Sequence, residues 1–119
     1  MADYRSLQAW KSARAVTGFT VRIYRQSRRS VPAAFLEQLC RAALSVQLNI
    51  AEGYALGTRP QFRRHLAIAF GSVVEVDELL TTSLEEHLIE VELGALALAE
   101  CRRSKRTLLG LLKKFRPLG

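Results

Sequence analysis

The stretch from Ala33 to Tyr54 constrains the fold of this chain more than any other part of it. It consists of helix-forming and small residues, contains no proline, and carries only three charged side chains, Glu37, Arg41 and Glu52. A helix that is apolar around nearly its whole circumference is buried on most of its sides. Other helices must therefore surround this one, and the sequence predicts a helical bundle.

Start and stop signals for helices divide the chain into four long segments. Ser6 is the expected N-cap of the first helix, and Pro32 separates it from the second, because a proline disfavours helical backbone in the residue before it. Gly57 ends the second helix, and Thr58 caps the third, with Pro60 in its first turn. The predicted helices cover about residues 6–28, 33–56, 59–86 and 90–115. Short connections then predict an all-α fold, an antiparallel up-down-up-down four-helix bundle in which residues 1–119 form a single domain.

Two strongly polar residues, Asn49 and Glu52, end the most apolar segment. A buried carboxylate is costly unless it is paired or hydrogen-bonded. We therefore expect both residues to be structural, with Glu52 packed against a neighbouring helix and bound to Arg64, Ser72 or a backbone N–H. Gly71 lies inside the third predicted helix, where glycine costs roughly 1 kcal/mol relative to alanine. We expect a close helix–helix approach at Gly71 as compensation, with a kink as the alternative, and Ser72 as a small packing residue beside it.

The composition points to a basic protein without a membrane segment. A formal net charge of +7 and a pI of about 10.1 indicate an anionic partner, with nucleic acid the first candidate. Cys40 and Cys101 match no zinc or redox spacing, so we expect small core or interface residues. No apolar run approaches the roughly 18 residues of a membrane span, and residues 1–10 lack a signal-peptide core. The expected location is the cytoplasm, with no membrane partner.

The first predicted helix carries a stripe of cations and no anions. No acid occurs between Asp3 and Glu37. Solvated helix faces usually mix signs, because like charges one turn apart repel each other. A stripe of one sign therefore requires an anion from outside the helix, either a polyanion or an acidic surface of another subunit. Its members are Lys11, Arg14, Arg22, Arg25 and Arg29.

Antiparallel packing turns the remaining charges into two different ends of the bundle. From Glu75 to Glu100 there are eight acids and no lysine or arginine, so this end is acidic. The arginines that close the first helix return to the acidic end, where acids of the same or a neighbouring subunit can pair with them. The opposite end of the bundle has few acids. We therefore rank its cations above the arginines of the acidic end as nucleic-acid contacts. The candidate nucleic-acid-binding residues are Arg59, Arg63, Lys113, Lys114, Arg116, Lys11 and Arg14.

The sequence offers little for catalysis, and we expect a protein that is not an enzyme and holds no metal or cofactor. A di-iron bundle needs E-x-x-H motifs on facing helices, but the residues three before the two histidines are Phe62 and Leu84. A nuclease needs clustered carboxylates to hold metal ions. The only tight cluster is Glu75, Asp77 and Glu78, and on a helix Asp77 diverges from the other two.

Three stretches carry a resemblance to a known family: LQAWK at 7–11, the tract from QLCRAA at 38–43 to NIAEG at 49–53, and FRRHLAIA with GS at 62–72. Over about residues 5–116 the chain resembles the bacterial four-helix-bundle family first noted as open reading frames inside intervening sequences of 23S ribosomal RNA genes. That family also includes relatives of the accessory variability determinant of diversity-generating retroelements. It usually has a proline two residues before the asparagine, where this chain has Gln47, so the second helix is expected to be straighter here.

The resemblance implies a small cytosolic bundle that assembles as a ring-like homo-oligomer, a pentamer. In the retroelement branch it implies contacts with nucleic acid and with a reverse transcriptase. Self-association is also expected from the residues, because the first two helices are more apolar than one bundle needs. The favoured function is a non-catalytic, basic homo-oligomer that binds nucleic acid through phosphate contacts. The alternative is a structural or protein-docking oligomer that binds no nucleic acid.

Overall fold

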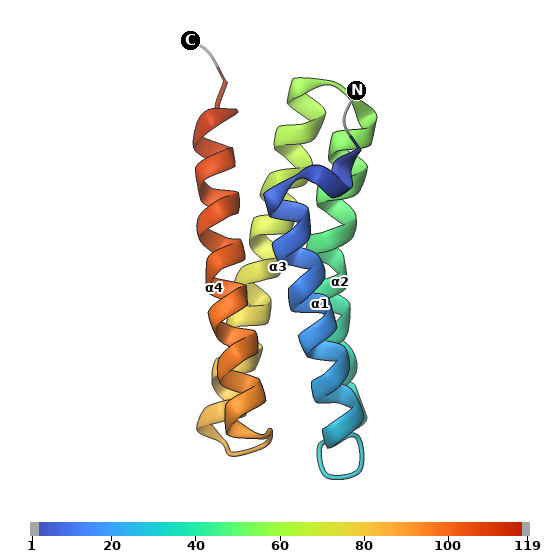
Figure 1. The fold of residues 1–119 in the computed structure, drawn as a ribbon, viewed down its shortest axis with the longest axis vertical. Helices are drawn as coiled ribbons and strands as arrows, with labels where there is room; N and C mark the ends of the chain where they lie inside the picture. The colour runs from blue at the N-terminus through green and yellow to red at the C-terminus, as the bar shows by residue number, and fades with distance from the viewer. Residues whose placement is uncertain (1–2, 118–119) are drawn as a thin grey trace.

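Four long helices, joined by short connections, run in alternating directions along the molecule (Figure 1). The computed structural model describes residues 3–117. α1 packs against α2 and α4, and α3 packs against the same two helices, so the four helices close around one core. The predicted all-α four-helix bundle is confirmed. The elements are a 3-10 turn, η1 (Tyr4–Ser6), and the helices α1 (Gln8–Ser27), α2 (Ala33–Leu56), α3 (Arg59–Glu85) and α4 (Val91–Lys114).

α2 provides the most apolar side of the core. Leu36, Leu39 and Ile50 recur at helical spacing and are 0% exposed. The opposite side of α2 is not covered by the other helices, since Leu44 and Leu48 are 42% and 53% exposed. The prediction that α2 is buried on most sides therefore holds only for its core-facing half within one chain.

Capping residues define the ends of α2, α3 and α4. Gly57 follows α2 with φ of 80°, a left-handed conformation that glycine adopts readily. Thr58 Oγ1 accepts a hydrogen bond from the Gln61 N–H at 3.3 Å, as expected for the N-cap of α3. The Glu90 carboxylate accepts hydrogen bonds from the backbone N–H groups of the first turn of α4. These caps place the two chain reversals next to α3 where the sequence predicts them.

The start of α1 differs from the prediction. Ser6 does not cap α1 but lies in η1, where its hydroxyl donates a hydrogen bond to the Asp3 carbonyl at 2.7 Å. The Asp3 carboxylate accepts a hydrogen bond from the Arg5 N–H and caps this turn. Leu7 then occupies the N-cap position of α1 without a side-chain cap, and the helix begins at Gln8. Ser6 belongs to the turn that Asp3 caps, so it cannot serve as the N-cap of α1.

α2 and α3 approach each other closely at Gly53 and not at Gly71. A Cβ atom at Gly53 would lie 2.5 Å from the Cβ of His65, whereas a Cβ at Gly71 would meet nothing within 4 Å. Gly71 faces outward and is exposed. The expected close helix–helix approach at Gly71 is therefore wrong, because this residue lies on the side of α3 that points away from the core.

We predict opposite stability effects for alanine at these two glycines. Gly53→Ala should lower the free energy of unfolding by about 1–3 kcal/mol, because overpacking outweighs the gain in helix preference. Gly71→Ala should raise it by up to about 1 kcal/mol, because an exposed helical alanine gains that preference without a clash. Urea denaturation at a fixed chain concentration measures both. A Gly53→Ala variant as stable as the wild type, or a destabilised Gly71→Ala variant, contradicts these placements.

Candidate nucleic-acid interface

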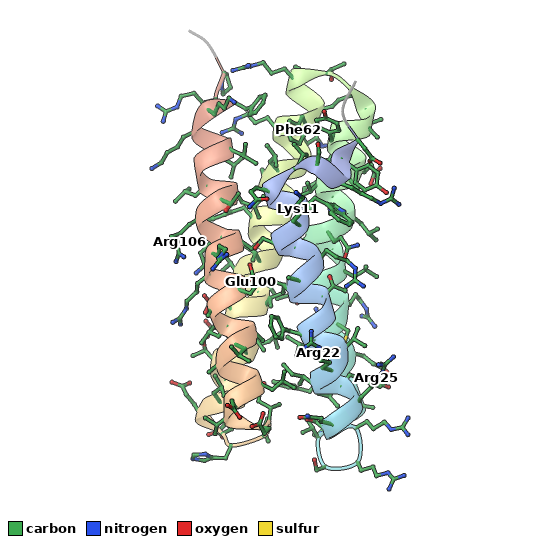
Figure 2. The ribbon with its side chains drawn as sticks, viewed as in Figure 1. Lys11, Arg22, Arg25, Phe62, Glu100 and Arg106 are labelled. Carbon is green, nitrogen blue, oxygen red and sulfur yellow. The ribbon has the colours of Figure 1, made fainter. Side chains whose placement is uncertain are left out.

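Four cations line the outer face of α1. At 3.6 residues per turn, positions 11, 14, 22 and 25 fall within about 80° of one another around the helix. All four side chains are exposed, and Figure 2 shows Lys11, Arg22 and Arg25 along α1. We call this set the α1 stripe; Arg29, which was predicted to belong to it, lies in the turn after α1. The members of the α1 stripe are Lys11, Arg14, Arg22 and Arg25.

No member of the α1 stripe forms an ion pair with any residue between 3 and 117. The ion pairs in that range use only four cations, Arg5, Arg102, Arg103 and Lys105. Like charges on one helix face repel each other, and binding of an external anion reduces this repulsion. The α1 stripe is therefore the candidate anion-binding surface.

The α1 stripe borders an open groove of about 680 Å³ that faces α4. Ala15, Gly18 and Phe19 lie between the cations and line the groove with them. The guanidinium carbon of Arg22 lies 4.8 Å from the centre of the Phe19 ring, a cation–π contact that orients this arginine. The groove therefore combines small residues, which allow close approach, with four positive side chains.

Glu100 on α4 is the only acid among the residues that line this groove. Its carboxylate accepts a hydrogen bond from the Ser12 hydroxyl at 2.6 Å, and Arg103 Nε lies 3.9 Å from the same oxygen. The carboxylate is thus held against α1 by Ser12 and partly neutralised by Arg103. Figure 2 shows Glu100 and Arg106 on the α4 side of the molecule.

Two further cations of α4 are engaged with an acid of α3. Lys105 Nζ and Arg102 Nε lie 3.0 and 3.3 Å from Asp77 Oδ2. Burial raises the pKa of Asp77, but the hydrogen bonds from Lys105 and Arg102 outweigh it and hold this pKa below its ordinary value. These two cations therefore tie α4 to α3 and contribute less to the candidate interface. Arg103 and Arg106 were not among the predicted binding residues, although their spacing of three residues places them on one outer side of α4.

The basic end of the bundle is partly engaged in internal contacts. Arg59 donates a hydrogen bond from Nη2 to the Lys114 carbonyl at 3.0 Å and stacks over the Phe115 ring at 4.8 Å. Arg116 Nε donates to the Lys113 carbonyl at 3.3 Å. Arg63 is half-buried, and its Nε has no hydrogen-bond partner among the described residues. We call Arg59, Arg63, Lys113, Lys114 and Arg116 the basic end.

The structure brings the predicted binding residues together as two separate groups. Lys11 and Arg14 join Arg22 and Arg25 in the α1 groove, whereas Arg59 and Arg63 share a pocket of about 310 Å³ with Phe115. All four members of the α1 group are exposed and free of side-chain hydrogen bonds among the described residues, whereas at the basic end Arg63 is half-buried and Arg59 and Arg116 donate to backbone carbonyls. The geometry therefore favours the α1 groove over the basic end as the candidate interface.

A row of hydrogen bonds between polar side chains joins α2 to α3. Asn49 donates from Nδ2 to the Ser45 carbonyl at 2.9 Å, and its Oδ1 lies 2.9 Å from His65 Nδ1. The hydroxyl groups of Ser45 and Ser72 are 2.9 Å apart. Gln38 donates to the Glu75 carboxylate farther along the same seam. α2 continues as a helix through Gln47.

Glu52 lies outside this seam, which corrects the expectation that it is buried and paired. Its side chain is exposed, and it makes no hydrogen bond or ion pair within residues 3–117. Asn49 and Gly53 occupy the side of α2 that faces α3, and the helical turn directs Glu52 away from that side. Arg64, its expected partner, is exposed as well.

No three His, Cys, Asp or Glu side chains between residues 3 and 117 are grouped so that they could hold a metal ion. Over the same range, none of the helices is both long and apolar enough to cross a membrane. Both cysteines are free. Burial raises the pKa of Cys101 to about 12, and burial also raises the pKa of Cys40, which is only half-buried.

We predict that Asn49, and not Glu52, contributes to stability through its side chain. Asn49→Ala should lower the free energy of unfolding by about 1–3 kcal/mol, because it leaves the half-buried His65 ring nitrogen without its partner. Glu52→Ala, on the same turn of α2, is the matched control and should change it by less than about 0.5 kcal/mol. Thermal or urea unfolding compares the two. Equal effects from both substitutions would show that the seam does not depend on Asn49.

Comparison with known proteins places the chain in a family. No curated protein matches it. A crystal structure of a protein with unknown function from the S23 ribosomal protein family of Bacteroides thetaiotaomicron superimposes with a TM-score of 0.79 at 18% identity, over 88% of this chain and 98% of that chain. At this identity the similarity shows the fold alone. A family model described as 23S rRNA-intervening sequence protein matches residues 5–110. The chain therefore belongs to the family of 23S rRNA-intervening sequence proteins.

Proposed function

We propose that this protein is a non-catalytic, basic homo-oligomer that binds nucleic acid through phosphate contacts. The observation that carries the proposal is the α1 stripe, four exposed cations that form no ion pair within residues 3–117 and border one open groove. Lysine and arginine contacts to phosphates supply most of the affinity of sequence-independent binding. Phosphate contacts position a nucleic acid but do not read its sequence. Binding should therefore show little sequence preference.

Self-association supports this function by repeating the α1 stripe in each subunit. Several weak contacts linked in one particle bind more tightly than each alone. Leu44 and Leu48 on α2 and Leu96 on α4 are each more than 40% exposed, and apolar surface of this kind marks an interface. The number of five subunits rests on the family resemblance alone. Light scattering at micromolar concentration that gives the mass of one 13.3 kDa chain would contradict the oligomer.

The proposal also includes the physiological partner and the cellular compartment. The name of the family refers to intervening sequences of 23S rRNA, so RNA is the first probe to use. A reverse transcriptase partner, which the retroelement branch implies, stays a prediction. Two free cysteines suit a reducing compartment such as the cytoplasm.

We predict that binding falls steeply with salt and depends mainly on α1. A filter-binding assay with random RNA and DNA should give a log–log salt slope of several units, since each neutralised phosphate adds roughly 0.9 on a duplex. Replacing Lys11, Arg14, Arg22 and Arg25 by glutamine should reduce affinity and slope more than replacing Arg59, Arg63, Lys113 and Lys114. The second variant also removes four positive charges, but from the basic end, and is the matched control.

Two results would change this assignment. Equal losses in the two variants would mean that net charge, and not the α1 groove, controls binding. No retention of RNA or DNA by the wild type at about 50 mM salt, where phosphate contacts are weakly screened, would reject nucleic-acid binding. The structural or protein-docking oligomer would then be the better assignment.

A further inference from the structure

An apolar pocket with three arginines opens between the end of α1 and the start of α2. Its volume is about 520 Å³, and Val21, Tyr24 and Cys40 line it. Glu37 is the only acid among its lining residues. The three arginines form no ion pair with any described residue. We call this site the arginine-rimmed pocket; its arginines are Arg25, Arg28 and Arg41.

The start of α4 has the opposite character. Val91 is 69% exposed, more than any other large hydrophobic residue among those described. Glu90 and Glu92 on either side of it are exposed, as are Glu85 and Glu86 at the end of α3. None of these acids forms an ion pair within the described range. We call residues 90–92 the Val91 turn.

The Val91 turn is held in a defined conformation. The Glu90 carboxylate accepts hydrogen bonds from Glu92 N and Leu93 N at 3.2 and 2.7 Å, which fixes the first turn of α4. The chain enters this turn through His87, whose φ of 55° reverses its direction. A backbone turn that is already fixed loses little conformational freedom when it is bound.

The pocket and the turn lie at the same end of the bundle but on different helix pairs. The α1–α2 connection and the α3–α4 connection are both at the bottom of Figure 1, on opposite sides of the molecule. α1 and α2 form the pocket, and the turn begins α4 beside the end of α3. A chain therefore cannot place its own turn in its own pocket, whereas a second bundle lying parallel beside it brings the two to the same height.

We propose that the arginine-rimmed pocket receives the Val91 turn of a second copy of this chain. This proposal rests on the self-association proposed above and identifies the surfaces that make it. Val91 fills the apolar pocket, and Glu90 and Glu92 meet Arg28 and Arg41. The charges of the two surfaces are complementary, and the apolar lining favours this occupant over a polyanion, because a phosphate backbone carries no apolar group for Val21, Tyr24 and Cys40.

The contact joins two different surfaces, so each added copy leaves one free pocket and one free turn. Such head-to-tail contacts continue until they close into a ring or form an open filament. Of the pocket arginines, only Arg25 also borders the α1 groove. The remaining members of the α1 stripe stay available for nucleic acid in the assembled particle.

Two charge-reversal variants test the contact by complementation. The pocket variant is Arg28→Glu with Arg41→Glu, and the turn variant is Val91→Lys with Glu92→Lys, which keeps the Glu90 cap. Each variant alone should dissociate to single chains in light scattering, with affinity reduced at least about 30-fold, the effect of breaking a desolvated charge pair. A one-to-one mixture should associate again into alternating assemblies, because the acidic pocket of the first variant meets the basic turn of the second. A ring of five cannot alternate the two variants, so regained association, and not the wild-type mass, is the expected result. Circular dichroism melting confirms that both variants fold.

Cys40 provides a second measurement, which follows the assembly of the wild type directly. Its thiol lines the pocket, so alkylation by iodoacetamide should slow as wild-type concentration rises and assembly covers the pocket. The turn variant should show no such dependence, and the buried Cys101 serves as the unreactive reference. Variants that still associate alone, or a mixture that stays monomeric, would overturn the pocket assignment. A wild type that is monomeric at all concentrations would reject self-association itself, whatever the result of nucleic-acid binding.

Discussion

The close packing of α2 against α3 is the contact on which the rest of the bundle depends. It brings the backbones together at Gly53, where no side chain intervenes before His65. The hydrogen bond between Asn49 and His65 and the pair of serine hydroxyls set the register of the two helices along this seam. Because the helices are joined by only Gly57 and Thr58, a fixed register also fixes where α1 and α4 can pack. The positions of both candidate surfaces follow from it.

Acidic and basic side chains are concentrated on different helices of the bundle. The acids are concentrated in α3 and the first half of α4, while α1 has none. Asp77 holds Arg102 and Lys105, and Glu100 holds Ser12 and contacts Arg103, so acids near the middle of the bundle join its helices. The acids at the α3–α4 connection and the cations of α1 form no such contacts within the described residues. These two groups of charged side chains are therefore available to bind other molecules.

The two surfaces left in this way suit different partners. The α1 groove is positive, open and lined by small residues, which suits the repeating charge of a phosphate backbone. The pocket between α1 and α2 is smaller and mostly apolar inside its ring of arginines, which suits a protein turn with both apolar and acidic groups. One basic helix can therefore contribute to assembly at its end and to nucleic-acid binding along its length.

The sequence by itself determined the helices, their order and most of their ends. Proline, glycine and capping residues act through the local backbone, so Pro32, Gly57 and Thr58 could be assigned without knowing what lies near them in space. Helical periodicity likewise identified the α1 stripe, because neighbours on a helix face are set by the rotation per residue. The start of α1 was the exception, since the Asp3 turn competes with the cap at Ser6.

Only the tertiary structure decided which polar and small residues carry the packing. Gly53 and Gly71 are both helical glycines, and the sequence gives no means of telling that one faces His65 and the other faces solvent. Asn49 and Glu52 differ by three positions, yet only Asn49 faces α3, because the angle at which a neighbouring helix packs selects one side of the turn. The pairing of Asp77 with Lys105, and the opposite placement of the arginine-rimmed pocket and the Val91 turn, likewise depend on how four helices close around one core. Contacts between residues far apart in the chain are set by packing, which local sequence preferences do not encode.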